Sequence, residues 1–244
     1  MVDINVVYQT VLALADKDQG GYITPQEFNL FAEHAQMEIF EQYFYDLNQF
    51  KRVPGNQSDY SDAVGIIEDK IHFFIAKANN VSSNAYVLPT ATGAQNEFYR
   101  MNSVSMVDSN GNSYPAEKTD RHQQNIYTAP LLQPTLKRPI YYMLGVESGM
   151  SVQFKPDNLP NTTVNISWIR KPKKPNWTYI VSANTNKPLW NSNAVDMQHF
   201  ELHPSEKEVL VNKILHAAGV SVGDYNLAQV ATAEEVKTIQ QEKA

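Results

Sequence analysis

Cysteine is absent from the 244-residue chain. The protein therefore has no disulfide framework, no thiolate metal ligand and no cysteine nucleophile. No apolar run approaches the ~18 residues that a membrane-spanning helix needs. An acidic residue, Asp3, stands where a signal peptide requires basic residues. We therefore expect neither a disulfide-stapled secreted protein nor a membrane partner.

Charged residues are also scarce, at 19% of the chain, and the formal net charge is −6. Because there is no global basic excess, composition gives no indication of a nucleic-acid-binding protein. Polar surface must come largely from Asn, Gln, Ser and Thr, and tyrosine is the most frequent aromatic residue, with 13 copies against 10 Phe and 3 Trp. A surface of this kind favours extensive packing against protein partners.

Familiar catalytic signatures are missing as well. The sequence contains no HExxH, GxSxG, GxxxxGK or GxGxxG motif. We therefore expect no enzyme, no catalytic residues and no cofactor.

Residues 2 to 79 are predicted to be helical. A first helix has Val6, Val7, Thr10, Val11 and Leu14 at helical spacing. The second helix starts with a capping box, Thr24 as N-cap and Glu27 at N3, with Pro25 at N1. It is predicted to run from Pro25 to Phe50 and to be buried on more than one side, because its apolar residues cover two faces. A third helix is predicted from Asp62 to Ala76.

Residues 80 to 200 are predicted to form strands. The runs expected to be extended are Phe98 to Val107, Pro139 to Leu144, Ser151 to Phe154 and Thr163 to Ile169. In the last run Val164, Ile166 and Trp168 share one face. Asn110-Gly111 predicts a hairpin with a type I′ turn. Ten prolines lie between Pro89 and Pro188, so several of these strands are expected to be edges or extended arms.

The C-terminal part returns to helix. Pro204 is expected at N1 of a helix that follows His203, and Gly219 at its C′ position. Residues 225 to 242 predict a weaker helix, and the segment 225–244 is expected to become ordered only on a partner. The predicted fold class is α+β, with a helical bundle formed by residues 1–80 and 200–244. Residues 81–199 are predicted to form a β-rich insertion.

The segment Asp16 to Glu27 resembles an EF-hand calcium loop. The matching residues are Asp16, Asp18, Gly21, Ile23 and Glu27. However, Gly20 offers no side-chain oxygen at the fifth position, and no second loop is present to pair with this one. Helix termination at the glycines, followed by the Thr24–Glu27 capping box, accounts for the same residues. We therefore prefer a turn without metal and keep a calcium-binding module as an alternative.

Two further clusters could carry chemistry. Arg170 to Trp177 places four cations beside an aromatic residue, which would suit transient contact with DNA. We favour a proline-stiffened arm whose charges lie in solvent or on acidic neighbours. His199, Glu201 and His203 could suggest a metal site. Since Pro204 disfavours the α conformation at His203, we expect an extended segment whose polar trio faces outward while Phe200 and Leu202 face inward, with no metal.

Three stretches of the chain resemble structural proteins of short-tailed bacteriophages, including crAss-like phages. They are VYQTVLALADKDQGGYITPQEFNLFAEHAQMEIFEQYFYDLNQF, ISWIRKPKKPNWTY and FELHPSEKEVLVNKILHAAGVSV, in this order along the chain. The resemblance implies a head–tail connector ring, or adaptor, below the portal, assembled from twelve copies in the host cytoplasm. It also implies a helical bundle with a β-rich extension, and it brings no active-site residues.

The expected function is therefore that of a virion structural protein at the head–tail junction. Its expected partners are further copies of itself, the portal protein and neighbouring ring or tail proteins. The helix from Pro25 to Phe50 is expected to be the spine of the bundle. Within the same class a tail-hub or tail-tube subunit is the alternative, and a phage enzyme such as a cell-wall hydrolase is disfavoured by the missing motifs.

Overall fold

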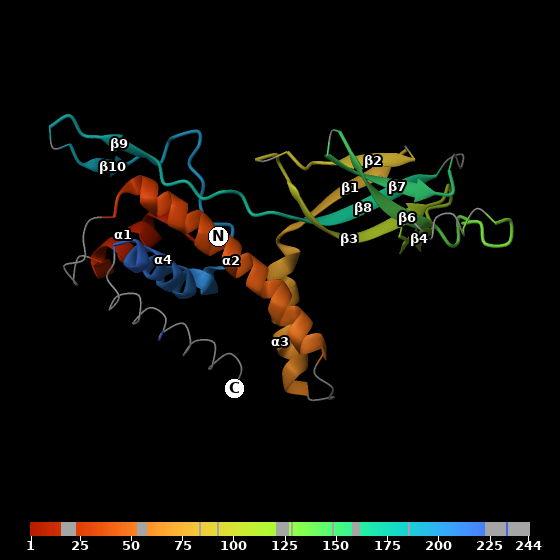
Figure 1. Cartoon of the computed structure of the whole chain (residues 1–244), viewed down its shortest axis with the longest axis horizontal. Helices are drawn as coiled ribbons and strands as arrows, with labels where there is room; N and C mark the ends of the chain where they lie inside the picture. Colours follow the sequence, from red (N-terminus) through yellow and green to blue (C-terminus); the bar gives the residue numbers. More distant parts are fainter. Residues whose placement is uncertain are drawn as a thin grey trace. The chain divides into compact units, whose positions relative to one another are not determined.

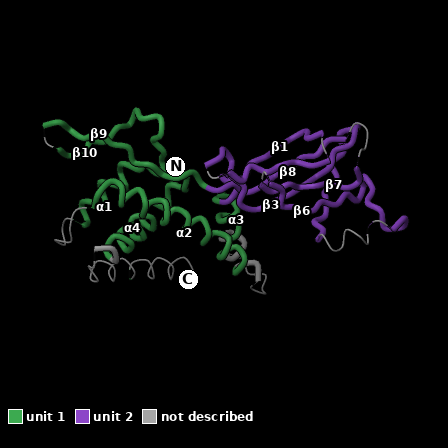
Figure 2. Tube along the Cα trace, turned by 45° about the horizontal axis from the view of Figure 1, so that its top comes forward, with its two compact units in different colours: residues 1–70, 172–244 green, residues 71–171 purple. Residues whose placement is uncertain are grey.

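The computed structural model describes residues 1–15, 23–52, 58–82, 84–91, 93–120, 127, 129–147, 149–157, 162–184, 186–222 and 233. Within them the chain is mixed α+β, as predicted. It forms two compact units, coloured separately in Figure 2. Unit 1 comprises Met1–Lys70 and Pro172–Ala244, and unit 2 comprises Ile71–Lys171.

Unit 1 contains the helical elements, apart from the last two residues of α3, and Figure 1 labels α1 to α4. They are α1 (Ile4–Ala15), α2 (Pro25–Arg52), α3 (Ser58–His72), the 3-10 helix η3 (Pro204–Glu206) and α4 (Lys207–Val222). Helix α4 packs against both α1 and α2. It does so through a buried face of Leu210, Val211, Ile214, Leu215 and Ala218. The apolar residues of α4 therefore lie on one face, and this face packs the C-terminal helix against α1 and α2.

Unit 2 is a sandwich of two four-stranded sheets. One sheet has the order β1-β8-β3-β4 and the other β2-β7-β6-β5. Their bounds are β1 (Ile75–Val81), β2 (Ala85–Leu88), β3 (Phe98–Val107), β4 (Ser113–Pro115), β5 (Glu117–Lys118), β6 (Ile140–Val146), β7 (Gly149–Lys155) and β8 (Thr163–Arg170). The core includes the predicted face Val164, Ile166 and Trp168, together with Val152 and Phe154 of the opposite sheet. Alternation along β7 and β8 thus fills the space between the sheets.

The units do not follow the expected boundaries at residues 80/81 and 199/200. Residues 75–81 form β1, which pairs with β8, so they belong to the sandwich rather than to the helices. For the same reason the third predicted helix is too long at its C-terminal end, since α3 stops at His72. Ile75 and Ala76 instead pair with Ile169 and Trp168 of β8.

The first predicted helix is confirmed as α1, whereas two local predictions, on Gly219 and on the turn of the β3–β4 hairpin, were wrong. In α1, Val6 and Leu14 are exposed, and the buried face is Ile4, Val7, Tyr8, Val11 and Ala15. That helix is apolar almost all round, so periodicity alone could not choose the face. Gly219 lies inside α4 with ordinary helical backbone and does not end it.

The second wrong prediction concerns the turn of the β3–β4 hairpin. Only Gly111 has positive φ there, at 83°, so its turn is not type I′. Asp108 accepts the Gly111 N–H on its carbonyl at 3.0 Å and the Asn110 N–H on its carboxylate. The loop is therefore a three-residue loop with a single left-handed glycine.

The first prediction tests the sandwich core. Phe154→Ala should lower the free energy of unfolding by about 3–5 kcal/mol, because it removes a buried aromatic side chain and leaves a cavity. Urea denaturation of the full chain measures the change. The control is Val87→Ala on the neighbouring strand β2, where the side chain is exposed and the loss should stay below about 1 kcal/mol. Equal losses for both variants would contradict the described packing.

Candidate interaction surface

After β8 the chain enters unit 1, where a buried amide fixes its path across α2. The Gln36 side chain, which is 1% exposed, donates from Nε2 to the Lys173 carbonyl at 2.8 Å. Its Oε1 accepts the backbone N–H of Glu201 at 2.9 Å. Glu201 in turn accepts the Lys173 N–H on Oε2 at 2.8 Å. We call these three residues the Gln36 clasp; it satisfies buried polar groups from three distant parts of the chain.

A second contact holds the same segment one to two turns earlier on α2. Asn29 accepts the Trp177 N–H on Oδ1 at 2.8 Å and donates from Nδ2 to the Trp177 carbonyl at 3.2 Å and to Asn176 Oδ1 at 3.0 Å. Lys174 forms an ion pair with Glu33 at 2.7 Å. Asn29, Glu33 and Gln36 occupy one face of α2, as their spacing requires.

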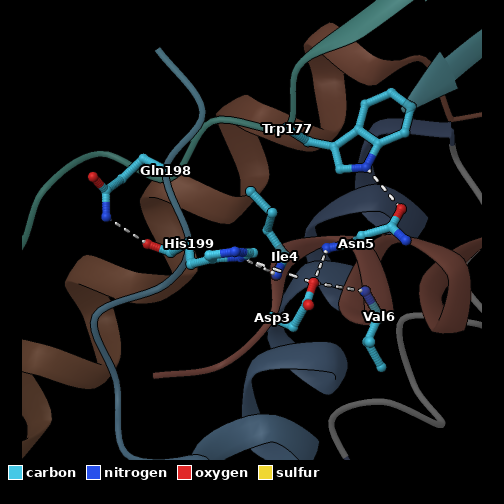
Figure 3. Close-up of polar contacts among 7 residues, drawn as sticks. All are labelled: Asp3, Ile4, Asn5, Val6, Trp177, Gln198 and His199. Carbon is cyan, nitrogen blue, oxygen red and sulfur yellow. Dashed lines mark hydrogen bonds and ion pairs between the residues drawn. The ribbon is translucent and has the colours of Figure 1, made fainter. Parts of the chain in front are cut away.

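Trp177 connects this segment to the N-terminus of the chain. Its indole Nε1 donates to Asn5 Oδ1 at 3.1 Å, as Figure 3 shows. The ring lies 4.2 Å from that of Tyr8 and stacks on Tyr179 at 5.9 Å. The buried indole thus joins α1 to the first residue of strand β9.

The side chains of His199, Glu201 and His203 make capping and backbone contacts. His199 accepts the Ile4 N–H on Nδ1 at 3.2 Å, while Asp3 caps α1 by accepting the Asn5 N–H at 2.8 Å (Figure 3). His203 caps η3 by accepting the Ser205 N–H at 3.3 Å. The expectation that Glu201 faces outward was wrong, since its side chain is drawn inward by the Lys173 N–H. Phe200 and Leu202 are buried, as expected.

The cations of Arg170 to Trp177 are largely engaged within the chain. Arg170 lies over the Phe74 ring at 5.7 Å, and Lys171 pairs with Glu97 at 2.6 Å. Lys174 forms its ion pair with Glu33, so these charges lie on acidic neighbours, as expected for this proline-stiffened segment. Transient DNA contact stays a prediction.

The EF-hand-like loop falls largely outside the described residues, which omit 16–22. At its end, the capping box is confirmed: Thr24 donates to Glu27 Oε2 from its backbone N at 3.0 Å and from Oγ1 at 2.7 Å, and Glu27 N donates back at 3.3 Å. These hydrogen bonds from Thr24 lower the pKa of the Glu27 carboxyl below its ordinary value of 4.5. Glu27, which would be the bidentate ligand in the calcium-binding alternative, therefore caps α2.

Beyond Trp177 the chain forms a hairpin of strands β9 (Tyr179–Val181) and β10 (Pro188–Trp190), which we call the arm. Ile180 faces the same side as its partner Leu189, and Val181 faces the other. These three and Trp190 are between 38 and 59% exposed. In Figures 1 and 2 the arm stands clear of the helices of unit 1. Both its faces therefore present apolar side chains to solvent.

No protein-family model and no curated protein matches the chain. In the part that the structure describes, no helix is long and apolar enough to cross a membrane. The same residues contain no group of three His, Asp or Glu side chains that could hold a metal ion.

Sequence reasoning missed both the Gln36 clasp and the arm. The available signal for the clasp was a polar residue at position 36, inside a helix that is apolar on two faces. The arm has strands of only three residues, and Pro188 opens one of them. Such short runs give almost no periodicity to detect.

The second prediction concerns the clasp. Gln36→Leu should lower the free energy of unfolding by about 2–4 kcal/mol, because it leaves the Lys173 carbonyl and the Glu201 N–H unsatisfied in a buried site. Urea denaturation measures the loss. Gln42→Leu is the matched control, since Gln42 is exposed on the same helix and bonds only Asp46 among the described contacts. A Gln36→Leu variant as stable as this control would contradict the clasp.

The third prediction concerns pH. Because the folded-state pKa of Glu27 is lowered, its carboxylate stabilises the folded state above pH 4.5, and this contribution disappears as pH falls through the lowered pKa. Glu27→Gln should therefore be less stable than the natural chain at pH 6, and the difference should close at low pH. Denaturation curves across that range measure it. In a Thr24→Ala background the same substitution should cost much less, and an unchanged cost would refute capping as the cause.

Proposed function

We propose that this protein is a virion structural protein, a subunit of a head–tail connector ring below the portal of a short-tailed phage. The observation that supports it most is the arm, whose apolar side chains are exposed on both faces. A two-stranded hairpin is marginal in water by itself. An apolar one that stands clear of its own unit is suited to burial against another subunit.

The resemblance to phage structural proteins supports the same proposal from another direction. Its three stretches lie far apart in the sequence. Each contributes to the contacts that hold residues 173–177, which we call the root of the arm. Asn29 and Gln36 come from the first stretch, Lys173 and Trp177 from the second, and Glu201 from the third. The parts of the chain that resemble the family therefore share one structural task.

In this proposal the helices of unit 1 form the bundle of the ring subunit, with α2 as its spine. Unit 2 projects toward neighbouring ring or tail proteins, and the ring surrounds the DNA exit channel at the head–tail junction. The segment 225–244, of which only residue 233 is described, becomes ordered when it docks on a partner, as expected from the sequence. A tail-hub or tail-tube subunit would use the same surfaces, and the portal protein distinguishes the two.

The fourth prediction tests assembly directly. Native mass spectrometry of the purified protein, at high concentration and with added portal protein, should show a closed ring of twelve copies, alone or on the portal. Repeated heterologous contacts close into such a ring only when each copy uses two different surfaces. Portal protein incubated with an unrelated acidic protein of similar size serves as the control. A monomer under all conditions would contradict the proposal, and a ring that ignores the portal would favour the tail-hub alternative.

A further inference from the structure

The arm and its root are free of acidic residues. From Lys171 to Val195 the sequence contains four lysines and no Asp or Glu, although the chain as a whole has a net charge of −6. Lys187 lies beside the turn of the hairpin and is exposed, and no ion pair of its side chain occurs among the described residues. The arm therefore combines an apolar surface with a free positive charge.

Helix α2 has three faces with different tasks. The first is buried in unit 1 and contains Phe28, Ala32, Ala35, Ile39 and Tyr43. The second holds the root of the arm through Asn29, Glu33 and Gln36. The third is exposed and contains Leu30, His34, Glu38, Glu41 and Tyr45, which we call the α2 stripe.

The α2 stripe is the chemical complement of the arm. Leu30 and Tyr45, near its two ends, are 65 and 61% exposed. Between them lie Glu38, which pairs with Lys213 at 2.8 Å, and Glu41, which has no ion pair among the described residues. The stripe thus offers apolar side chains and an unpaired carboxylate, whereas the arm offers apolar side chains and an unpaired ammonium group. Both kinds of contact favour association of the two surfaces.

A copy cannot place its own arm on its own α2 stripe. At 100° per residue, the stripe lies about 130° around α2 from the face that holds the root of the arm. Asn29 and Gln36, which are seven residues apart on α2, hold that root at two points. The arm must therefore find the stripe of another copy.

We propose that the arm of one copy docks on the α2 stripe of the next copy, with Leu189 against Leu30 and Lys187 beside Glu41. This inference rests on the proposed function, since it names the contact between neighbouring copies of the ring. The two surfaces are different, so the contact is head-to-tail and each copy both gives and receives an arm. Such a contact repeats from copy to copy until the ring closes.

The absence of cysteine makes this contact directly testable in the full chain. Leu189→Cys and Leu30→Cys are prepared as two separate variants, mixed and oxidised. The two variants have the same mass, so one of them is isotopically labelled. The mixture should give a disulfide-linked dimer whose mass shows one labelled and one unlabelled chain. The double variant with both cysteines should give a ladder of linked oligomers, because each copy then carries both halves of the contact. Leu30→Cys mixed with Leu131→Cys is the control, since Leu131 lies outside the arm and is 99% exposed.

Substitutions without cysteine give a second readout. Leu189→Ser should weaken association by about tenfold or more, because it removes apolar burial at the contact. Lys187→Glu should weaken it by about two- to fivefold, as expected for one exposed ion pair, and Glu41→Lys in the partner copy should restore it. Val87→Ser, an equally exposed position in unit 2, should leave association unchanged. Sedimentation equilibrium measures each constant.

The outcomes separate this inference from the proposed function. One outcome is that rings or portal complexes form while the Leu30→Cys and Leu189→Cys variants give no disulfide, or give no more than the Leu131→Cys control. Either result would overturn the arm-to-stripe contact and leave the ring proposal standing. Arm variants that lose portal binding but still self-associate would assign the arm to the portal and also overturn it. A linked ladder that neither closes nor binds the portal would support the contact and contradict the connector function. A monomer that never links would overturn both.

Discussion

The side-chain amide of Gln36 is the interaction on which the arrangement of unit 1 depends. It joins α2 to Lys173 and Glu201, which lie 137 and 165 residues away in the sequence. An amide has both a donor and an acceptor, so one side chain can satisfy a carbonyl and an N–H in the same buried place. Its net stabilisation is modest, but each orphaned group would carry a large penalty. A different path of residues 173–201 across α2 would leave these groups unsatisfied and is therefore disfavoured.

Because its root is fixed on α2, the arm has a defined position before it meets a partner. An apolar hairpin on a flexible tether could fold back on its own helices or pair with any open strand edge. Here the buried Trp177 and the contacts of Asn29 hold the chain on α2 up to Trp177, two residues before β9. Ordering of the root takes place during folding, so association does not have to supply it again. The arm is therefore preorganised for one direction of approach.

Features that depend on neighbouring residues were predictable from the sequence, and features that depend on distant ones were not. The capping box at Thr24 and the extents of β3 and β8 follow from local signals. The burial of Glu201 does not, because it requires a backbone N–H that arrives from Lys173, 28 residues away. The end of α3 is equally non-local, since Ile75 leaves the helical pattern to pair with β8. The arm was missed because its strands gain their position from the root and not from their own sequence.

The distribution of charge also bears on whether the basic segment meets protein or nucleic acid. Phosphate binding gains strength from several free cations that act together. Of the five cations from Arg170 to Lys187, Arg170 lies over an aromatic ring, and Lys171 and Lys174 are paired with carboxylates. Lys173 is exposed and has no ion pair among the described residues. Lys187 is set among exposed apolar side chains, which a phosphate backbone cannot cover. A single charge within an apolar surface is the pattern of a protein contact, where burial supplies affinity and the charge selects orientation.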